Sequence, residues 1–288
     1  MGTLSAPSER DTDHVAFMIS GSGPTDRDGN SPALPGKNDG LKLLAAGLNE
    51  AGLATLRIDK RGIGQSVATP QRDLLFETYV GDGVAWLEHL KSGLGFRRFS
   101  IIGHSEGSLV GMLVAESFPV ERFVSLEGAG RPAQDTIVRQ LRAQLPAPLL
   151  TEVKEVIDRL AAGGETDPLP DGIRAVPALA TMFRTEVQPY LMSWFEYDPA
   201  AVLGRLDIPI LIVQGTTDLQ VGSADARRLV AANPRARLAE IEGMNHVLKV
   251  AAADHKANLA TYANPDLPLA PDLVPTIARF LTAPDRPL

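Results

Sequence analysis

The pentapeptide Gly103-His104-Ser105-Glu106-Gly107 places a serine between two glycines, a spacing that can expose a nucleophile. An apolar, β-branched run from Phe99 to Ile102 precedes it, and a helix-like run of small and apolar residues follows it. Because glycine lacks a Cβ atom, the chain can turn sharply there and hold the serine in a strained conformation. The pattern of strand, sharp turn and helix therefore predicts that Ser105 is a nucleophile at the N-terminus of a helix.

A serine hydroxyl becomes a good nucleophile only when a base takes its proton and a third group orients that base. Of the five histidines, His246 is the one that directly follows the last predicted strand, where a loop would carry it over the carboxyl edge of a sheet. Asp218 ends the preceding predicted strand and can hold the imidazole in the required tautomer. A rival acid, Asp225, belongs to the first turn of the next predicted helix. The sequence thus predicts a triad of Ser105, His246 and Asp218.

Acyl transfer also needs backbone N–H donors for the negative oxygen that forms in the transition state. One predicted donor is the N–H of Glu106, which follows the nucleophile. The second is expected from the loop after the first predicted strand, where Ser22 is the first candidate and Gly23 the next. This loop begins like a phosphate-binding G-x-G-x-x-G motif, but Asp26 occupies the sixth position and no Gly-Lys-Ser/Thr follows. A nucleotide site is therefore not expected.

Several neighbours of these residues have two interpretations. An apolar cluster before residue 196 could form a wall of the substrate pocket, or could pack the predicted cap against the core. Its members are Tyr190, Met192, Trp194 and Phe195. The charged loop residues Asp26, Arg27 and Asp28 could line the substrate entrance, but an internal ion-pair network that braces the loop is favoured. Lys60 and Arg61 are expected to brace the following turn.

The candidate residues require elements that bring them to one edge of a sheet. Six short apolar runs predict strands at Val15–Ile19, Ala54–Ile58, Phe99–Ile102, Phe123–Leu126, Ile208–Val213 and Arg237–Ile241. Helical patterns alternate with these runs, so an α/β fold is expected, with a mostly parallel sheet of about six strands and helices on both faces. Between residues 131 and 199 only helical patterns occur, which predicts a helical cap inserted in a core of residues 14–130 and 200–288. Residues 1–13 are polar and are expected to be loose.

The composition narrows the class of protein. With 288 residues, 44% of them hydrophobic and 22% charged, the chain has the composition of a globular protein. A formal net charge of -7 argues against nucleic acid or an anionic membrane as a partner. The absence of cysteine excludes disulfides and thiolate chemistry. Neither a signal pattern nor an apolar run of membrane-spanning length is found, so a cytoplasmic protein is expected, as a monomer or a homo-oligomer.

The pentapeptide, the placement of Asp218 and His246, and the turn from Asp59 to Ser66 together resemble the α/β-hydrolase superfamily. More narrowly, segments 21–30 and 242–249 are similar to bacterial serine carboxylesterases of the serine-aminopeptidase-like group. One departure is Ser20, because the family usually has histidine before the glycine of the oxyanion loop. The resemblance implies hydrolysis of a small-molecule carboxylic ester through an acyl-enzyme intermediate and an oxyanion hole, without a metal or a cofactor.

Two alternatives remain open. The same triad could cleave aminoacyl amides or peptides, lactones or thioesters, and a substrate with a free amine would need a carboxylate from the cap, such as Glu186 or Glu196. A protein of another class, a non-catalytic binder with this fold, would have no need of a complete triad. A haloalkane dehalogenase is disfavoured because its chemistry requires aspartate at the position of Ser105.

Overall fold

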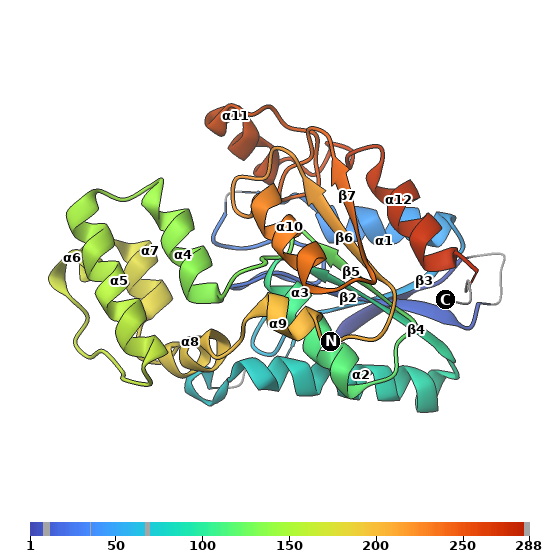
Figure 1. Ribbon diagram of the computed structural model, residues 1–288, viewed down its shortest axis with the longest axis horizontal. Coiled ribbons are helices and arrows are strands. Elements are labelled where there is room, and N and C mark those ends of the chain that lie inside the picture. Colours follow the sequence, from blue (N-terminus) through green and yellow to red (C-terminus); the bar gives the residue numbers. More distant parts are fainter. Residues whose placement is uncertain (8–11, 35, 67–69, 285–288) are drawn as a thin grey trace.

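The computed structural model of the protein describes residues 1–7, 12–34, 36–66 and 70–284. Within them, a seven-stranded sheet runs in the order β1-β3-β2-β4-β5-β6-β7 through the centre of the molecule (Figure 1). Its strands are β1 (Gly2–Ser5), β2 (His14–Ile19), β3 (Ala54–Ile58), β4 (Arg98–His104), β5 (Arg122–Leu126), β6 (Ile210–Gly215) and β7 (Ala236–Ile241). Strands β2 to β7 pair with one another in parallel, which confirms the predicted mostly parallel sheet.

The seventh strand, β1, corrects the sequence expectation for the N-terminus. Residues Gly2–Ser5 pair antiparallel with Thr55–Ile58 of β3, where a loose segment is expected from the sequence. Four mostly polar residues carry no apolar run, so this strand is defined by its tertiary pairing at the sheet edge rather than by its own composition. The expectation for residues 8–11 lies outside the described residues.

Helices cover both faces of the sheet (Figure 1). Helices α1 (Gly40–Glu50) and α12 (Leu273–Thr282) pack on one face, and α2 (Phe76–Leu94), α3 (Glu106–Ser117), α9 (Pro199–Leu203) and α10 (Ser223–Ala232) pack on the other. Along β2, Ala16 and Met18 belong to the hydrophobic core between the sheet and helices α1 and α12. Val15, Phe17 and Ile19 belong to the core on the opposite face. This two-sided burial explains the unbroken apolar run of the strand.

The shorter helices include η1 (Gln71–Asp73), α11 (His255–Ala260) and η2 (Thr261–Ala263). From the sequence, Asp73 could cap a helix that extends to about Lys91, but Asp73 ends η1, and α2 begins at Phe76 after an extended Leu75. Among the described residues, none of the helices combines the length and the apolarity that a bilayer crossing requires.

Five helices between β5 and β6 make up the segment that the sequence predicts as a cap, and this segment keeps that name below: α4 (Ala133–Arg142), α5 (Ala147–Ala161), α6 (Asp171–Arg174), α7 (Pro177–Phe183) and α8 (Gln188–Phe195). They lie together at one end of the molecule, beside the core (Figure 1). Residues 131–199 are all described, and none of them belongs to a strand. Helix α8 connects the cap to the core, because Ser193 Oγ accepts a hydrogen bond of 2.8 Å from the backbone N–H of Phe76 at the start of α2.

Candidate active site

Ser105 occupies a sharp turn between β4 and α3, as its sequence context predicts. Its backbone has φ 55° and ψ -122°, a conformation that costs free energy in a residue with a Cβ atom. The flanking glycines are required by packing: a Cβ on Gly103 would lie 2.3 Å from the Gly107 carbonyl oxygen, and one on Gly107 would lie 2.4 Å from the Ile19 carbonyl oxygen. The turn therefore holds the serine, half-buried, at the N-terminus of α3.

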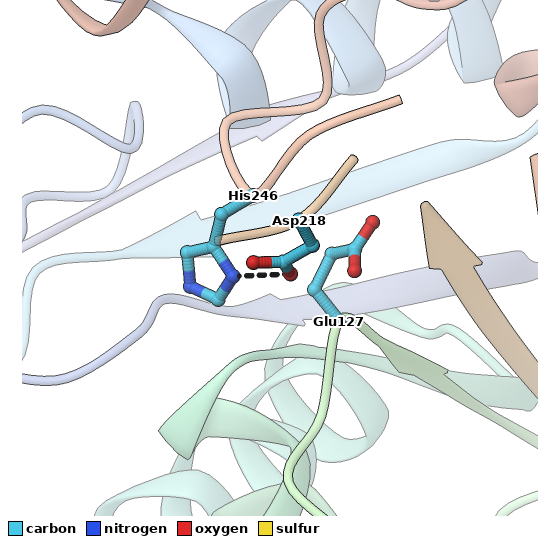
Figure 2. Close-up of side chains that lie close together, drawn as sticks. All are labelled: Glu127, Asp218 and His246. Atoms are coloured by element: carbon cyan, nitrogen blue, oxygen red, sulfur yellow. Dashed lines mark hydrogen bonds and ion pairs between the residues drawn. The ribbon is translucent and has the colours of Figure 1, made fainter. Parts of the chain in front are cut away.

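His246 and Asp218 meet above the carboxyl ends of β6 and β7 (Figure 2). His246 Nδ1 lies 2.7 Å from Asp218 Oδ2, and the two side chains are 6% and 0% exposed. The other carboxylate oxygen, Oδ1, accepts hydrogen bonds from the backbone N–H groups of Gln220 and Val221. Burial alone would raise the pKa of Asp218, but the attraction and hydrogen bond of His246 outweigh it and lower the pKa. An ionised Asp218 thus makes Nδ1 the donor and leaves Nε2 to act as a base.

His104 joins the serine turn to the loop that carries His246. Its Nε2 donates a hydrogen bond of 2.9 Å to the backbone oxygen of His246, and the two ring centroids are 4.9 Å apart. Burial lowers the pKa of His104 to about 3, so its ring is neutral. Within the described residues no hydrogen bond joins Ser105 Oγ to His246, and such bonds often form fully only when substrate is present.

Glu127 is a second acidic residue of the site, and the sequence analysis missed it (Figure 2). It directly follows β5, is fully buried, and has a left-handed φ of 51°. Its Oε1 accepts a hydrogen bond of 2.8 Å from the Gly215 N–H, and its Oε2 accepts one from the side chain of Gln214. Burial, and then the charge of Asp218, raise the pKa of Glu127 well above its usual range. One signal in the sequence could have identified Glu127: it follows the end of a parallel strand, β5, and Asp218 likewise lies in the loop after a parallel strand, β6.

The side chains of Glu127, Asp218 and His246 each have an atom within 4.8 Å of the others, a spacing that also occurs around metal ions. Hydrogen bonds account for this arrangement. Asp218 and His246 bind each other, and the pKa values of the two carboxyl groups shift apart as expected for a neutral Glu127 that donates to an ionised Asp218. The cluster is therefore best described as a chain of proton donors and acceptors.

The predicted oxyanion loop passes directly against Ser105. A Cβ on Gly21 would lie 3.1 Å from the Ser105 Cβ atom, and Ser22 and Gly23 are exposed beyond it. The favoured bracing role is confirmed for Arg27, which pairs with Asp59 at 2.8 Å, and for Asp28, which pairs with Arg57. Asp26 instead accepts hydrogen bonds from the backbone N–H groups of Asp28 and Asn30. The donor roles of Ser22, Gly23 and Glu106 stay predictions.

The four predicted pocket residues lie where α8 packs against α2. Tyr190 and Phe195 are buried, whereas Met192 and Trp194 are half-buried. The Trp194 ring stacks on Phe76 with a centroid distance of 5.8 Å, and the Tyr190 ring meets Tyr79 edge-on at 5.6 Å.

A cavity of about 280 Å³ lies elsewhere, between α2 and strands β2 and β3. It is lined by Met1, Phe17, Ile19, Ile58, Asp59, Lys60, Arg61, Ser66, Tyr79, Asp82, Gly83 and Trp86. None of the four predicted residues lines it, so their role in a substrate pocket stays a prediction.

Asp225, the alternative candidate for the acid, binds residues other than His246. It lies in the first turn of α10, as the sequence predicts, and its side chain is 3% exposed. It accepts hydrogen bonds from the Gly130 N–H, from Arg131 Nε at 2.8 Å and from Arg139 Nη1 at 2.9 Å. Asp225 thus fastens the first segment of the cap to the core, and Asp218 is the acid that contacts His246.

Comparisons with known proteins agree with this architecture. A family model described as the alpha/beta hydrolase family matches residues 32–261. The esterase EstD of Thermotoga maritima is 24% identical over 251 residues, which cover 86% of this chain and 57% of EstD. The chain therefore spans little more than half the length of that relative.

Two solved structures share the fold at low sequence identity. The protein Est1E of Butyrivibrio proteoclasticus, solved with ferulic acid bound, superposes with a TM-score of 0.61 at 19% identity, over 96% of this chain and 95% of that one. A proline iminopeptidase of Mycobacterium smegmatis superposes with a TM-score of 0.59 at 16% identity, over 97% and 93% of the two chains.

Proposed function

Since the chain belongs to the alpha/beta hydrolase family, we propose that it is a serine hydrolase that cleaves carboxylic esters through an acyl-enzyme intermediate. One observation carries the proposal: Ser105 is held in a strained turn whose preceding residue, His104, contacts the hydrogen-bonded pair of His246 and Asp218. A serine, an imidazole and a carboxylate in these positions are the groups that acyl transfer uses. The esterase EstD, a relative of the chain, supports an ester as the substrate class.

In the proposed reaction, Ser105 Oγ attacks the ester carbonyl carbon while His246 Nε2 takes the hydroxyl proton. Asp218 stabilises the resulting imidazolium through its hydrogen bond to Nδ1. The carbonyl oxygen becomes an oxyanion, for which the backbone N–H groups of Glu106 and Ser22 are the proposed donors. Collapse of the intermediate breaks the bond to the alcohol, which leaves with the proton from His246. Water, activated by the same imidazole, then releases the carboxylic acid and restores the serine.

An ester is favoured over a substrate with a free amine because the cap carboxylates are exposed, and an ion pair with an exposed carboxylate contributes little to binding. Glu186 and Glu196, the two candidates for binding an amine, are exposed side chains of the cap. The proposed partner is therefore a small-molecule ester. Separately, the sequence composition supports the cytoplasm as the proposed compartment.

The test is turnover of a chain-length series of p-nitrophenyl esters, combined with labelling by a fluorophosphonate. Wild type is expected to hydrolyse the esters and to become labelled, and Ser105→Ala is expected to lose both signals. Ser117→Ala is the matched control, because Ser117 is an exposed serine at the other end of the same helix.

The outcomes separate the alternatives. Labelling without ester turnover would contradict the ester proposal and would favour amides, lactones or thioesters. Absence of both signals in a folded wild type would favour a binding protein. Equal activity of Ser105→Ala and wild type would exclude Ser105 as the nucleophile.

A further inference from the structure

A buried ion pair lies directly beneath the serine turn. Lys60, in the turn after β3, places its Nζ 3.1 Å from Glu106 Oε1, and the two side chains are only 3% and 2% exposed. Removing both charges from water costs several kcal/mol, of the order that their attraction returns, so a buried pair is weak evidence for a purely stabilising role. The location of the pair suggests another reason for its presence.

The ammonium of Lys60 also reaches the predicted oxyanion loop. Its Nζ donates a hydrogen bond of 2.5 Å to the backbone oxygen of Gly21, and it lies 5.3 Å from the centre of the Tyr79 ring. Lysine has three N–H donors on a flexible stem, so one ammonium can serve the carboxylate, the carbonyl and the ring together.

This contact fixes the orientation of one peptide unit. The Gly21 carbonyl and the Ser22 N–H belong to the same planar amide, in which the two groups point in opposite directions when the bond is trans. Because Gly21 lies against Ser105, with 3.1 Å between the position of its Cβ and the serine Cβ, this amide borders the place where the substrate carbonyl would sit. A cation on the oxygen side also polarises the amide and strengthens its N–H as a donor.

The acidic member of the ion pair, Glu106, carries the other proposed oxyanion donor on its own backbone. Glu106 is the first residue of α3, and its own N–H is the donor that follows the nucleophile. One ion pair therefore connects the two backbone segments, one in the loop after β2 and one in the serine turn, whose N–H groups must converge on a single oxygen.

We propose that Lys60 is a positioning residue for the oxyanion hole, because its ammonium, held by Glu106, fixes the Gly21–Ser22 amide against Ser105. This inference rests on the proposed function, since it concerns the same acyl-transfer site. It assigns Lys60 no proton transfer and no contact with the substrate.

The experiment compares Lys60→Met with Arg61→Met, an adjacent control whose charge is half-exposed and paired with Asp82. We expect Lys60→Met to lower kcat for a p-nitrophenyl ester about 100- to 1,000-fold, the usual effect of losing one oxyanion donor, with KM nearly unchanged. The affinity for an alkyl trifluoromethyl ketone, which forms an oxyanion adduct with a serine, should fall in parallel. Arg61→Met should resemble wild type in all three quantities.

A double variant separates positioning from stability. Lys60→Met combined with Glu106→Leu removes both buried charges, keeps the Glu106 N–H position, and should fold even if Lys60→Met alone does not, because apolar replacement of a buried pair is often neutral or stabilising. We expect the folded double variant to remain defective in kcat and in ketone affinity. Wild-type values of both would show that the pair serves stability alone, and would overturn the proposal.

If the proposed function is wrong, the experiment would give a different pattern of results. In that case wild type, Arg61→Met and the Lys60 variants would all lack ester turnover and labelling, and the positioning role would fall with it. Failure of the positioning proposal alone would leave wild type active and the folded Lys60→Met variant equally active.

Discussion

At the scale of single residues, the arrangement next to Ser105 is a chain of three groups, in which Glu127, Asp218 and His246 follow one another (Figure 2). Residue types and strand ends were sufficient to predict that Asp218 and His246 lie at the same edge of the sheet, because each lies in the loop that follows a predicted strand. Glu127 has the same placement after β5, but a buried carboxyl group beside another is identifiable only when the neighbouring strand ends are known. The contact of Lys60 with Gly21 was likewise beyond the sequence, because it joins loops after two different strands.

The neutral Glu127 predicts a pH dependence of stability. Its pKa is raised by folding, so its contribution is fully present below the pKa of the unfolded chain and is lost as the pH rises through the higher folded value. We expect the free energy of unfolding of wild type to fall with rising pH more steeply than that of Glu127→Gln, which stays neutral. Urea unfolding at a series of pH values measures this difference. Parallel curves for the two proteins would mean that Glu127 is ionised throughout.

The two touching imidazoles allow a second prediction. His246→Gln should lower kcat/KM at least about 100-fold, because the proposed general base is lost. His104→Gln should cost less than about tenfold, since it removes one hydrogen bond to the His246 carbonyl, worth about 1 kcal/mol. Steady-state kinetics of both variants with one p-nitrophenyl ester provide the comparison. A larger loss for His104→Gln than for His246→Gln would reverse the assignment of the base.

At the scale of elements, the six parallel strands were predictable from short runs rich in apolar residues. Strands β2 to β6 are buried almost throughout because helices cover both faces of the sheet, whereas the edge strand β7 is only partly buried. The start of α2 was not, because the backbone at Leu75 is extended and the residues before it form a separate turn. The small residues of α3 let this helix lie close against the sheet. A Cβ on Gly111 would lie 2.9 Å from Ile101 Cγ2, so the helix lies directly on the strand beneath it.

Two glycines of α2 give a prediction at this scale. Gly81 is exposed and a Cβ there has no neighbour within 4 Å, whereas one on Gly83 would lie 2.6 Å from Val114 Cγ2 of α3. Gly81→Ala should raise the free energy of unfolding by about 0.5–1 kcal/mol, the usual gain of alanine within a helix. Gly83→Ala should lower it by about 1–3 kcal/mol through overpacking. Denaturant titration of both variants tests the contact, and a stabilised Gly83→Ala would contradict it.

At the scale of the whole molecule, the sequence indicated that the cap exists and is helical, because the strand pattern stops between residues 131 and 199. Its placement depends on contacts between distant residues, such as Asp225 with Arg131 and Arg139, which no local pattern encodes. The edge strand β1 escaped prediction for the same reason.

The Asp225 contacts predict how the cap is held. Asp225→Asn should lower the local stability of α4 by about 1–3 kcal/mol, because a buried carboxylate that binds two guanidinium groups is lost. Hydrogen exchange of the α4 amides measures this change. Asp207→Asn, which disrupts an exposed pair with Arg235, is the control and should leave α4 unchanged. Equal exchange rates in both variants would contradict this role of Asp225.

The cap is inserted at one crossover of the sheet, between the adjacent parallel strands β5 and β6. Parallel neighbours need a connection of a dozen or more residues, and α9 with the segment after it completes that connection without the cap. Residues 131–198 therefore lie outside the minimal connection, so a change in the length of this segment would leave the strand register and the ends of β4, β6 and β7 in place. Exchange of the segment at its two borders would replace the helices beside the sheet and keep the positions of Ser105, Asp218 and His246.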